Sequence, residues 1–250
     1  MKRTLTLLTS VLALWLLSSA AQAQWQDGNL AVRTNGTIFQ SGDQLKVEIL
    51  ALNEINEAFY TQVSYKFTET VKVKDDDGKD KTEKQERTRA RQPGPVLQSM
   101  EKYRSLLLDD TFHFGESNPT GRYLIEVSVF RAYGKDRLTT VRASVFFQNV
   151  DYSCKSCAPF LGSLKRANTA QWLTFDGIFA ESGRYTVLLL DKGQVVKQII
   201  TNIYPNGPRE LNIISDALDG TAGRTFDILI HDHDRNISST IARVTIPSTS

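Results

Sequence analysis

The sequence predicts an all-β protein made of two tandem antiparallel β-sandwich domains that follow a cleaved signal peptide. The first observation behind this prediction is that most segments after Gln24 alternate apolar and polar residues, which is the period of a half-buried strand. The second is that short turn sequences rich in Gly, Asn, Asp and Pro separate these segments. Strands punctuated in this way are typical of sandwiches and not of alternating strand and helix units.

Residues 1–23 have the composition of a secretory signal peptide. A basic start precedes a mostly apolar stretch over residues 5–17, which is short for a membrane span. Ala21-Gln22-Ala23 then forms a small-x-small cleavage site. We therefore expect cleavage near Ala23, an extracytoplasmic location (periplasmic or secreted), and no integral membrane segment in the mature chain.

The formal net charge of +2 comes from 30 Lys and Arg residues against 28 Asp and Glu residues. Lys2 and Arg3 belong to the expected signal peptide, which contains no acidic residue, so the mature chain is neutral. Proteins that bind nucleic acids normally carry a clear basic excess. We therefore expect no nucleic-acid partner.

The first domain is expected over residues 24–150. Its candidate strands share the two-residue alternation and cover residues 44–52, 60–67, 122–131 and 138–150. Residues 95–108 are the exception, because apolar side chains there recur at close to 3.6 residues and favour a short helix.

Residues 72–91 interrupt the first domain with fourteen charged residues in twenty. Such a segment cannot bury apolar surface on either face, so we expect a protruding hairpin or a flexible insertion with its tip at Asp77-Gly78. A solvated tip is the favoured interpretation, and the alternative is that the three consecutive aspartates bind a cation or a basic partner. The candidate interaction residues of this insertion are Asp75, Asp76, Asp77, Lys79, Arg87, Arg89 and Arg91.

Residues 151–163 form the expected linker, and they contain the only two cysteines of the chain, Cys154 and Cys157. Because the chain is expected to be exported, a local disulfide that clamps the linker is the favoured interpretation. A redox motif normally lies between a strand and a helix of a thioredoxin-like unit, a context that is missing from these flanks. A zinc half-site is the third interpretation, although the histidines lie far away in the sequence.

The second domain is expected over residues 164–250 and repeats the same strand pattern. Its candidate strands cover residues 171–179, 184–190, 194–203, 210–214, 224–231 and 240–246. Both domains also contain a Gly-Arg-Tyr sequence that opens an apolar strand, at Gly121 and at Gly183.

Two segments of the first domain resemble known sandwich domains. Residues 39–49 combine an apolar residue, a Gly-Asp turn and an alternating strand, and residues 120–127 begin with Thr-Gly-Arg-Tyr before another alternating strand. Both segments resemble bacterial immunoglobulin-like (Ig-like) and alpha-macroglobulin-type β-sandwich domains. The resemblance implies a sandwich fold and a role in contacts, and it implies no activity.

The candidate strand over residues 224–231 continues into the loop His231-Asp232-His233-Asp234-Arg235-Asn236. The second domain weakly resembles Ig-like sandwiches. Residues 226–236 resemble the strand and loop of calcium-dependent lipid-binding domains of the protein-kinase-C conserved-region type. The second resemblance implies that Asp232 and Asp234 are calcium ligands and that Asn236 is a nearby carbonyl donor.

The same loop has two other interpretations. His231 and His233 are two residues apart and share a face of an extended strand, so they suit zinc or copper. The favoured interpretation is a polar loop whose Asp and Asn side chains form local turn hydrogen bonds. A calcium site needs further carboxylates, for which Asp176 and Asp191 are the candidates.

Sequence motifs of common catalytic sites are absent: there is no Gly-x-Ser-x-Gly, no phosphate-binding glycine loop and no His-Glu-x-x-His. We therefore expect no enzyme activity and no cofactor, with calcium as the alternative. The favoured function is a non-catalytic interaction, adhesion or scaffold module at the cell envelope, with a protein or an envelope component as its partner. A metal-dependent binding module and a redox accessory that uses the cysteine pair are the alternatives.

Overall fold

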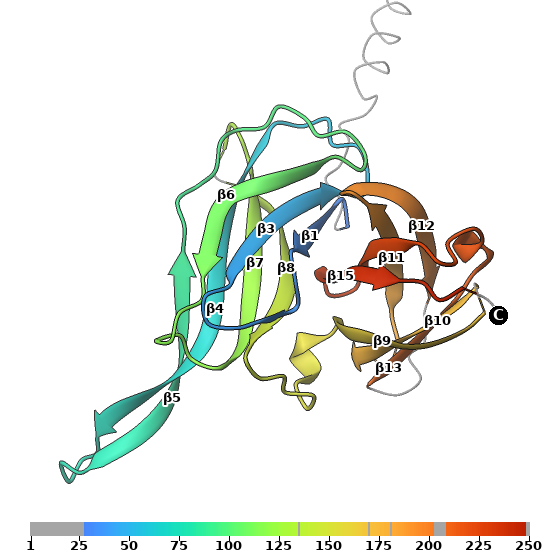
Figure 1. The fold of residues 1–250 in the computed structure, drawn as a ribbon. Coiled ribbons are helices and arrows are strands. Elements are labelled where there is room, and N and C mark those ends of the chain that lie inside the picture. Colours follow the sequence, from blue (N-terminus) through green and yellow to red (C-terminus); the bar gives the residue numbers. More distant parts are fainter. Residues whose placement is uncertain (1–27, 135, 170, 181, 203–208, 249–250) are drawn as a thin grey trace, which may run out of the picture.

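Strands account for nearly all of the regular structure, as the alternation predicted (Figure 1). Among the described residues only two single turns of 3-10 helix occur, and no helix is long and apolar enough to cross a membrane. The all-β fold class is therefore confirmed. The expected signal peptide lies outside the residues that the computed structural model describes, which are 28–134, 136–169, 171–180, 182–202 and 209–248.

One sheet of nine strands runs through most of the molecule (Figure 1). In spatial order its strands are β12 (Gln194–Asn202), β11 (Arg184–Asp191), β14 (Thr225–Asp232), β15 (Ile237–Thr245), β8 (Arg137–Phe147), β7 (Gly121–Arg131), β4 (Phe59–Lys74) and β5 (Asp80–Ala90), and β2 (Ile38–Phe39) pairs with β8 beside this path.

Two sheets of three strands pack against the large sheet and enclose two separate cores. The first core lies between the three-stranded sheet nearer the N-terminus and strands β4, β7 and β8 of the large sheet. It includes Ile49, Tyr65 and Tyr123. The second core lies between the other small sheet and strands β11, β14 and β15. The two small sheets are formed by β1 (Leu30–Thr34), β3 (Gln44–Ala51) and β6 (Ser105–His113), and by β13 (Glu210–Ile214), β10 (Trp172–Ile178) and β9 (Phe160–Thr169).

The two units are joined within the large sheet, a feature that the sequence pattern did not indicate. Strand β15 of the second unit pairs parallel with β8 of the first, with Ile237 opposite Arg142 and Ser238 opposite Ala143. The short strand β2 is also parallel to β8, so the sheets are not purely antiparallel as expected. Alternation reports which face a residue occupies, whereas the choice of neighbour depends on contacts between segments far apart in the chain.

An additional apolar cluster lies between the two units. Leu50 from β3 packs here with Leu188 from β11 and Leu229 from β14, and all three side chains are fully buried. Leu188 is excluded from the second core because neighbouring residues of a strand face opposite sides of the sheet. Both faces of β11 and β14 are therefore covered, the second one by the first unit.

Residues 95–108 do not form the expected short helix, so that prediction was wrong. Leu97 and Met100 instead make isolated bridges to Phe59 and Ile55, and β6 begins at Ser105. Of its apolar side chains, Met100 and Leu108 are buried, whereas Val96 and Leu107 are exposed. The backbone of Leu97 and Met100 exchanges hydrogen bonds with Phe59 and Ile55, an antiparallel pairing that requires an extended chain. Strand β9 begins at Phe160, inside residues 151–163 that are expected to form the linker.

Candidate functional site

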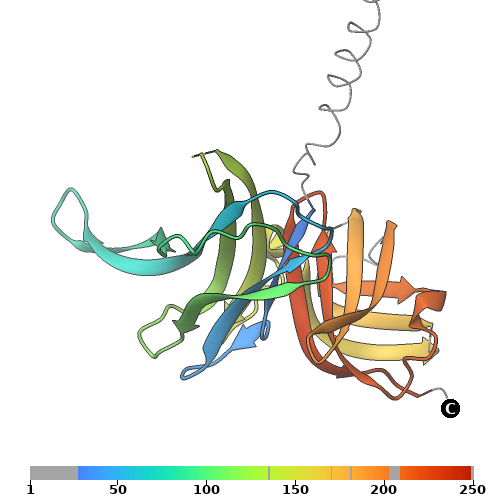
Figure 2. The same cartoon turned by 90° about the horizontal axis from the view of Figure 1, so that it is seen from above.

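The charged insertion forms the outer part of a β-hairpin that extends away from the first core (Figures 1 and 2). β4 and β5 pair from Ser64 opposite Ala90 to Lys74 opposite Asp80 without a break in register. The pairing of β4 with β7 ends at Phe67, so the two strands continue beyond that point without a third. We call residues 68–86 the ribbon.

The tip of the ribbon is a turn that is closed by its own hydrogen bonds. Oδ1 of Asp75 accepts from the backbone amides of Asp77 and Lys79 at 3.1 and 2.8 Å. Gly78 adopts a φ of +77°, a left-handed conformation that glycine tolerates without strain. One of the predicted interaction residues therefore shapes the turn, while Asp76, Asp77 and Lys79 are exposed on it.

The three predicted arginines lie at the base of the hairpin and not beside the aspartates. Nε of Arg87 lies 2.5 Å from Oε1 of Glu69, and the guanidinium of Arg89 lies 5.1 Å from the centre of the Phe67 ring. The backbone amide of Arg91 donates to the carbonyl of Val63. The structure thus separates the seven predicted interaction residues into a group at the tip and a group at the base.

A polar cleft of about 500 Å³ lies between the base of the ribbon, the start of β7 and the cysteine loop. Lys66 and Lys84 line one side of the cleft, and Arg122 and Cys154 line the other. Because residues of β4 alternate in direction, Lys66 faces away from the first core that holds Phe67. The cleft therefore lies on the outer face of the large sheet.

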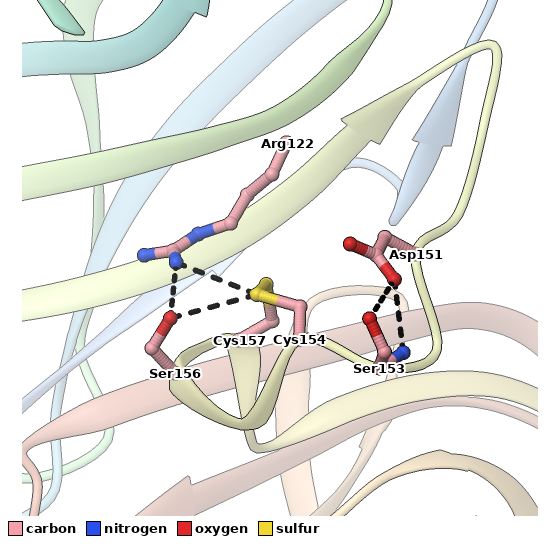
Figure 3. The surroundings of a disulfide bond; sticks show 6 residues. All are labelled: Arg122, Asp151, Ser153, Cys154, Ser156 and Cys157. Atoms are coloured by element: carbon pink, nitrogen blue, oxygen red, sulfur yellow. Dashed lines mark hydrogen bonds between the residues drawn. A yellow bond between two sulfur atoms is a disulfide. The ribbon is translucent and has the colours of Figure 1, made fainter.

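The two cysteines form the predicted disulfide, with their sulfur atoms 2.12 Å apart (Figure 3). Cys157 is fully buried in an apolar cluster with Phe146 and Phe160, whereas Cys154 is only half-buried. Lys155–Cys157 forms a single turn of 3-10 helix between them. Asp151 holds the entry to this turn, because its Oδ1 accepts from the amide and the hydroxyl of Ser153 at 2.9 and 2.6 Å.

Arg122 on β7 places a guanidinium beside the cysteine loop, a neighbour that the sequence did not indicate. Its Nη1 donates to Oγ of Ser156 at 2.7 Å and lies 3.6 Å from Sγ of Cys154 (Figure 3). Burial lowers the pKa of Arg122, an effect that Glu86 and Glu126 oppose by charge. The Gly-Arg-Tyr pattern contains this residue, but no local signal linked it to the cysteines, which it precedes by 32 positions or more.

The loop after β14 holds its two histidines in different surroundings. Nδ1 of His231 shares a hydrogen bond of 2.8 Å with Oγ of Ser238, and burial followed by the charge of His233 lowers the pKa of His231 to about 3. Nε2 of His233 lies 2.8 Å from Oγ1 of Thr186, and its Nδ1 packs so closely on Gly28 that a Cβ there would lie 2.7 Å away. The two rings meet edge to face, with centres 4.9 Å apart.

The remaining predicted ligands form a turn. Oδ1 of Asp232 accepts from the amides of Asp234 and Arg235 at 2.9 and 3.2 Å, and its Oδ2 lies 3.3 Å from Nε of Arg235. Asn236 adopts a φ of +52° and donates its side-chain amide to the carbonyl of Thr140 at 2.8 Å. The contacts of Asp232 have the local turn geometry that was the favoured interpretation, whereas the side chain of Asn236 bonds to β8, which is distant in the sequence.

The two further carboxylates that were candidate calcium ligands, Asp176 and Asp191, are engaged elsewhere. Asp176 pairs with Lys165, and Asp191 pairs with Arg224. Asp191 also lies at the far end of β11, since Tyr185 at the near end is opposite Asp232. Among the described residues, no three His, Cys, Asp or Glu side chains are grouped so as to hold a metal ion. Binding of calcium, zinc or copper at residues 231–236 remains the alternative interpretation of this loop.

No known protein family matches the sequence, and no curated protein is similar to it. Solved structures overlap it weakly. Escherichia coli alpha-2-macroglobulin is 11% identical in its native conformation with a TM-score of 0.29, and 13% identical after activation by porcine elastase with a TM-score of 0.31. These overlaps cover 88% of this chain but only 15% and 22% of the macroglobulin chains. A tandem-repeat region of a large adhesion protein is 14% identical with a TM-score of 0.26, over 88% of this chain and 50% of that one. Similarity at this level supports no argument about function.

Proposed function

We propose that this protein is an exported, non-catalytic interaction module that contacts a protein or envelope component through the ribbon, residues 68–86. The observation that carries the proposal is that β5 exposes every residue except Gln85, which is half-buried. A two-stranded ribbon in water is at best marginally stable and gains nothing from the core. A ribbon that does not stabilise the fold is well placed to make contacts. Export rests on the signal-peptide pattern of residues 1–23.

The charges of the ribbon indicate how the contact is made. β5 is an edge strand, and seven of its eleven residues are Asp, Glu, Lys or Arg. Charged edge strands resist the addition of another strand, so we expect side chains and not backbone groups to form the contact. Both signs occur together along the ribbon, which favours a partner of matching mixed charge. The closed tip limits the ordering cost of binding.

The experiment compares crosslinking from the tip with crosslinking from a distant surface. A photoactivatable residue at Asp76 should capture an envelope protein in the native cell, whereas the same residue at Asp219 of the second unit should not. In a shortened variant, residues 71–83 are replaced by Asn-Gly, which joins the paired residues Thr70 and Lys84 without a change of register. This variant should fold normally and lose the partner in a pull-down. With the photoactivatable residue at Asp219, it should also crosslink to no partner. Undiminished capture by the shortened variant would refute the ribbon as the contact element.

A further inference from the structure

The geometry points to a second function, beyond the contact role of the ribbon: the Cys154–Cys157 disulfide exchanges with thiols, and it oxidises a substrate dithiol that enters the cleft beside Arg122. The disulfide is then a reagent and not only a clamp. Three observations carry this inference, namely the unequal burial of the two sulfurs, the cation beside one of them, and the small loop that the bond closes.

The first observation is that the two sulfurs differ in access. Cys154 lines the polar cleft of about 500 Å³, whereas Cys157 is fully buried among apolar side chains. A thiol in solution can therefore reach Sγ of Cys154 alone. Cys154 is therefore the sulfur that a thiol attacks, and the buried Cys157 is the leaving sulfur.

The second observation is the position of Arg122. Its Nη1 lies 3.6 Å from Sγ of Cys154, and Oγ of Ser156 lies 3.5 Å from the same sulfur. A guanidinium at this distance stabilises a thiolate, and its partial burial reduces the screening of that attraction by water. Stabilising the thiolate stabilises the reduced form of the pair, which makes the disulfide a better oxidant. Figure 3 shows Arg122, Ser156 and Cys154 converging at one point.

The third observation is that the disulfide links residues only three positions apart. Closing so short a loop restricts the unfolded chain little, so the bond contributes little to stability by that route. The 3-10 turn is also held by the amide of Cys157, which donates to the carbonyl of Cys154 at 3.0 Å, and by the contacts of Asp151 with Ser153. The loop therefore keeps other restraints when the bond is reduced.

The exchange follows two balanced steps. A substrate thiolate attacks Sγ of Cys154, a mixed disulfide forms, and the electron pair of the broken bond leaves on Sγ of Cys157, which takes a proton from water. The second substrate thiolate then attacks the substrate sulfur of the mixed disulfide and expels Cys154 as a thiolate beside Arg122. Two substrate thiols become one disulfide, and the two electrons reside on the reduced cysteine pair.

The test is equilibration of the full-length mature protein with reduced and oxidised glutathione, followed by trapping and counting of free thiols. The wild-type pair should be reduced measurably by the glutathione buffer. Arg122→Gln should lower the equilibrium constant for reduction about tenfold, which corresponds to ~30 mV for a two-electron couple. Arg137→Gln is the control, because it also removes one positive charge. Arg137 begins β8, whereas Arg122 pairs with Phe146 near the end of β8, so this substitution should leave the equilibrium constant for reduction unchanged.

A second measurement remains decisive if Arg122→Gln folds poorly. In Cys157→Ala, Cys154 should react with oxidised glutathione with a pH midpoint well below that of an ordinary thiol, which is about 8.5. In Cys154→Ala, the buried Cys157 should stay unmodified in the native protein. A wild-type disulfide that resists reduction by any practical excess of glutathione would overturn the inference, as would equal reactivity of the two single cysteines.

Discussion

Nη2 of Arg33 lies 2.6 Å from Oδ2 of Asp227, and this ion pair joins strand β1 of the first unit to strand β14 of the second. Nη1 of the same guanidinium contacts Glu48 at 3.3 Å, and Oδ1 of Asp227 accepts from the amide of Arg243 at 3.0 Å. The side chain of Arg33 is 14% exposed, so the pair is shielded from water but not fully removed from it. Charge as well as apolar contact therefore holds the two units together.

Replacing Arg33 by Met should lower the free energy of unfolding by about 2 kcal/mol, because two carboxylates lose a charged hydrogen-bond donor. Asp227→Asn should cost less, since its amide oxygen still accepts from Arg243. A double-mutant cycle from urea unfolding measures the coupling between Arg33 and Asp227. Additive effects of the two substitutions would mean that the pair does not couple the units.

Leu188→Ala should destabilise both units together. This side chain is fully buried between them, so its truncation leaves a cavity and should cost ~2–5 kcal/mol. Hydrogen exchange of β7 in the first unit and β10 in the second should show the same loss of protection. Leu211→Ala, in the second core, is the matched control, and a loss confined to β10 in both variants would argue against cooperative unfolding of the shared sheet.

His231 should make stability fall in mild acid. Its pKa is lowered to about 3 in the folded protein, against about 6.5 for a solvated histidine. Between pH 6.5 and pH 3 the unfolded chain binds a proton at His231 that the folded chain does not. The contribution of neutral His231 to the free energy of unfolding is therefore full above about pH 6.5 and is lost as the pH falls toward about 3.

Urea unfolding of wild type and His231→Gln at several pH values measures this contribution. The wild type should lose stability relative to the variant as the pH falls. Subtracting the two curves removes opposing contributions from other groups, including Asp232, whose pKa is raised by burial. His113→Gln, at an exposed position of β6, is the control and should follow the wild type. A difference between wild type and His231→Gln that does not vary with pH would contradict the burial of a neutral His231.

Millimolar calcium or micromolar zinc should leave the melting temperature unchanged. Asp232 is already used by the amides of Asp234 and Arg235 and by the Arg235 side chain, so binding a metal requires breaking these contacts. A ligand of the native state raises the melting temperature by mass action. A rise that a chelator reverses, and that Asp232→Asn abolishes, would establish the metal site instead.

Gly78→Ala should disturb the ribbon locally. The φ of +77° penalises alanine by about 1 kcal/mol, although a Cβ there would meet no other atom within 4 Å. Hydrogen exchange of Val73 and Lys81 should become faster, while the melting temperature stays constant because the ribbon lies outside both cores. A clear drop in melting temperature would show that the ribbon supports the fold.

The sequence predicted the strands well, because alternation records which side of a strand is buried. Residues 44–52 and 122–131, for example, coincide with β3 and β7 to within one residue. The pattern failed for residues 95–108, where an apolar spacing suited to a helix occurs in an extended segment. It also failed for two strands whose residues do not alternate regularly. β1 begins with three consecutive apolar residues, and β9 mixes apolar and polar residues irregularly.

The candidate site could be predicted only in part. Cys154 and Cys157 are close in sequence, and a bond between them follows from their spacing and from the expected export. Arg122 could not be paired with them, because the contact depends on the cysteine loop folding over the outer face of β7 and β8. The loop 231–236 was found by its composition, but its roles depend on Ser238, Thr186 and Thr140, which lie on three different strands.

By itself the sequence determined the all-β class and the position of the charged insertion, since both follow from polarity at short range. The tertiary structure alone decided that β15 pairs with β8, that Arg33 meets Asp227 and that Arg122 lies beside Cys154. The reason is that local polarity fixes which side of a strand is buried. The partner on that side is chosen by the combined packing of segments that the chain brings together only when both units fold.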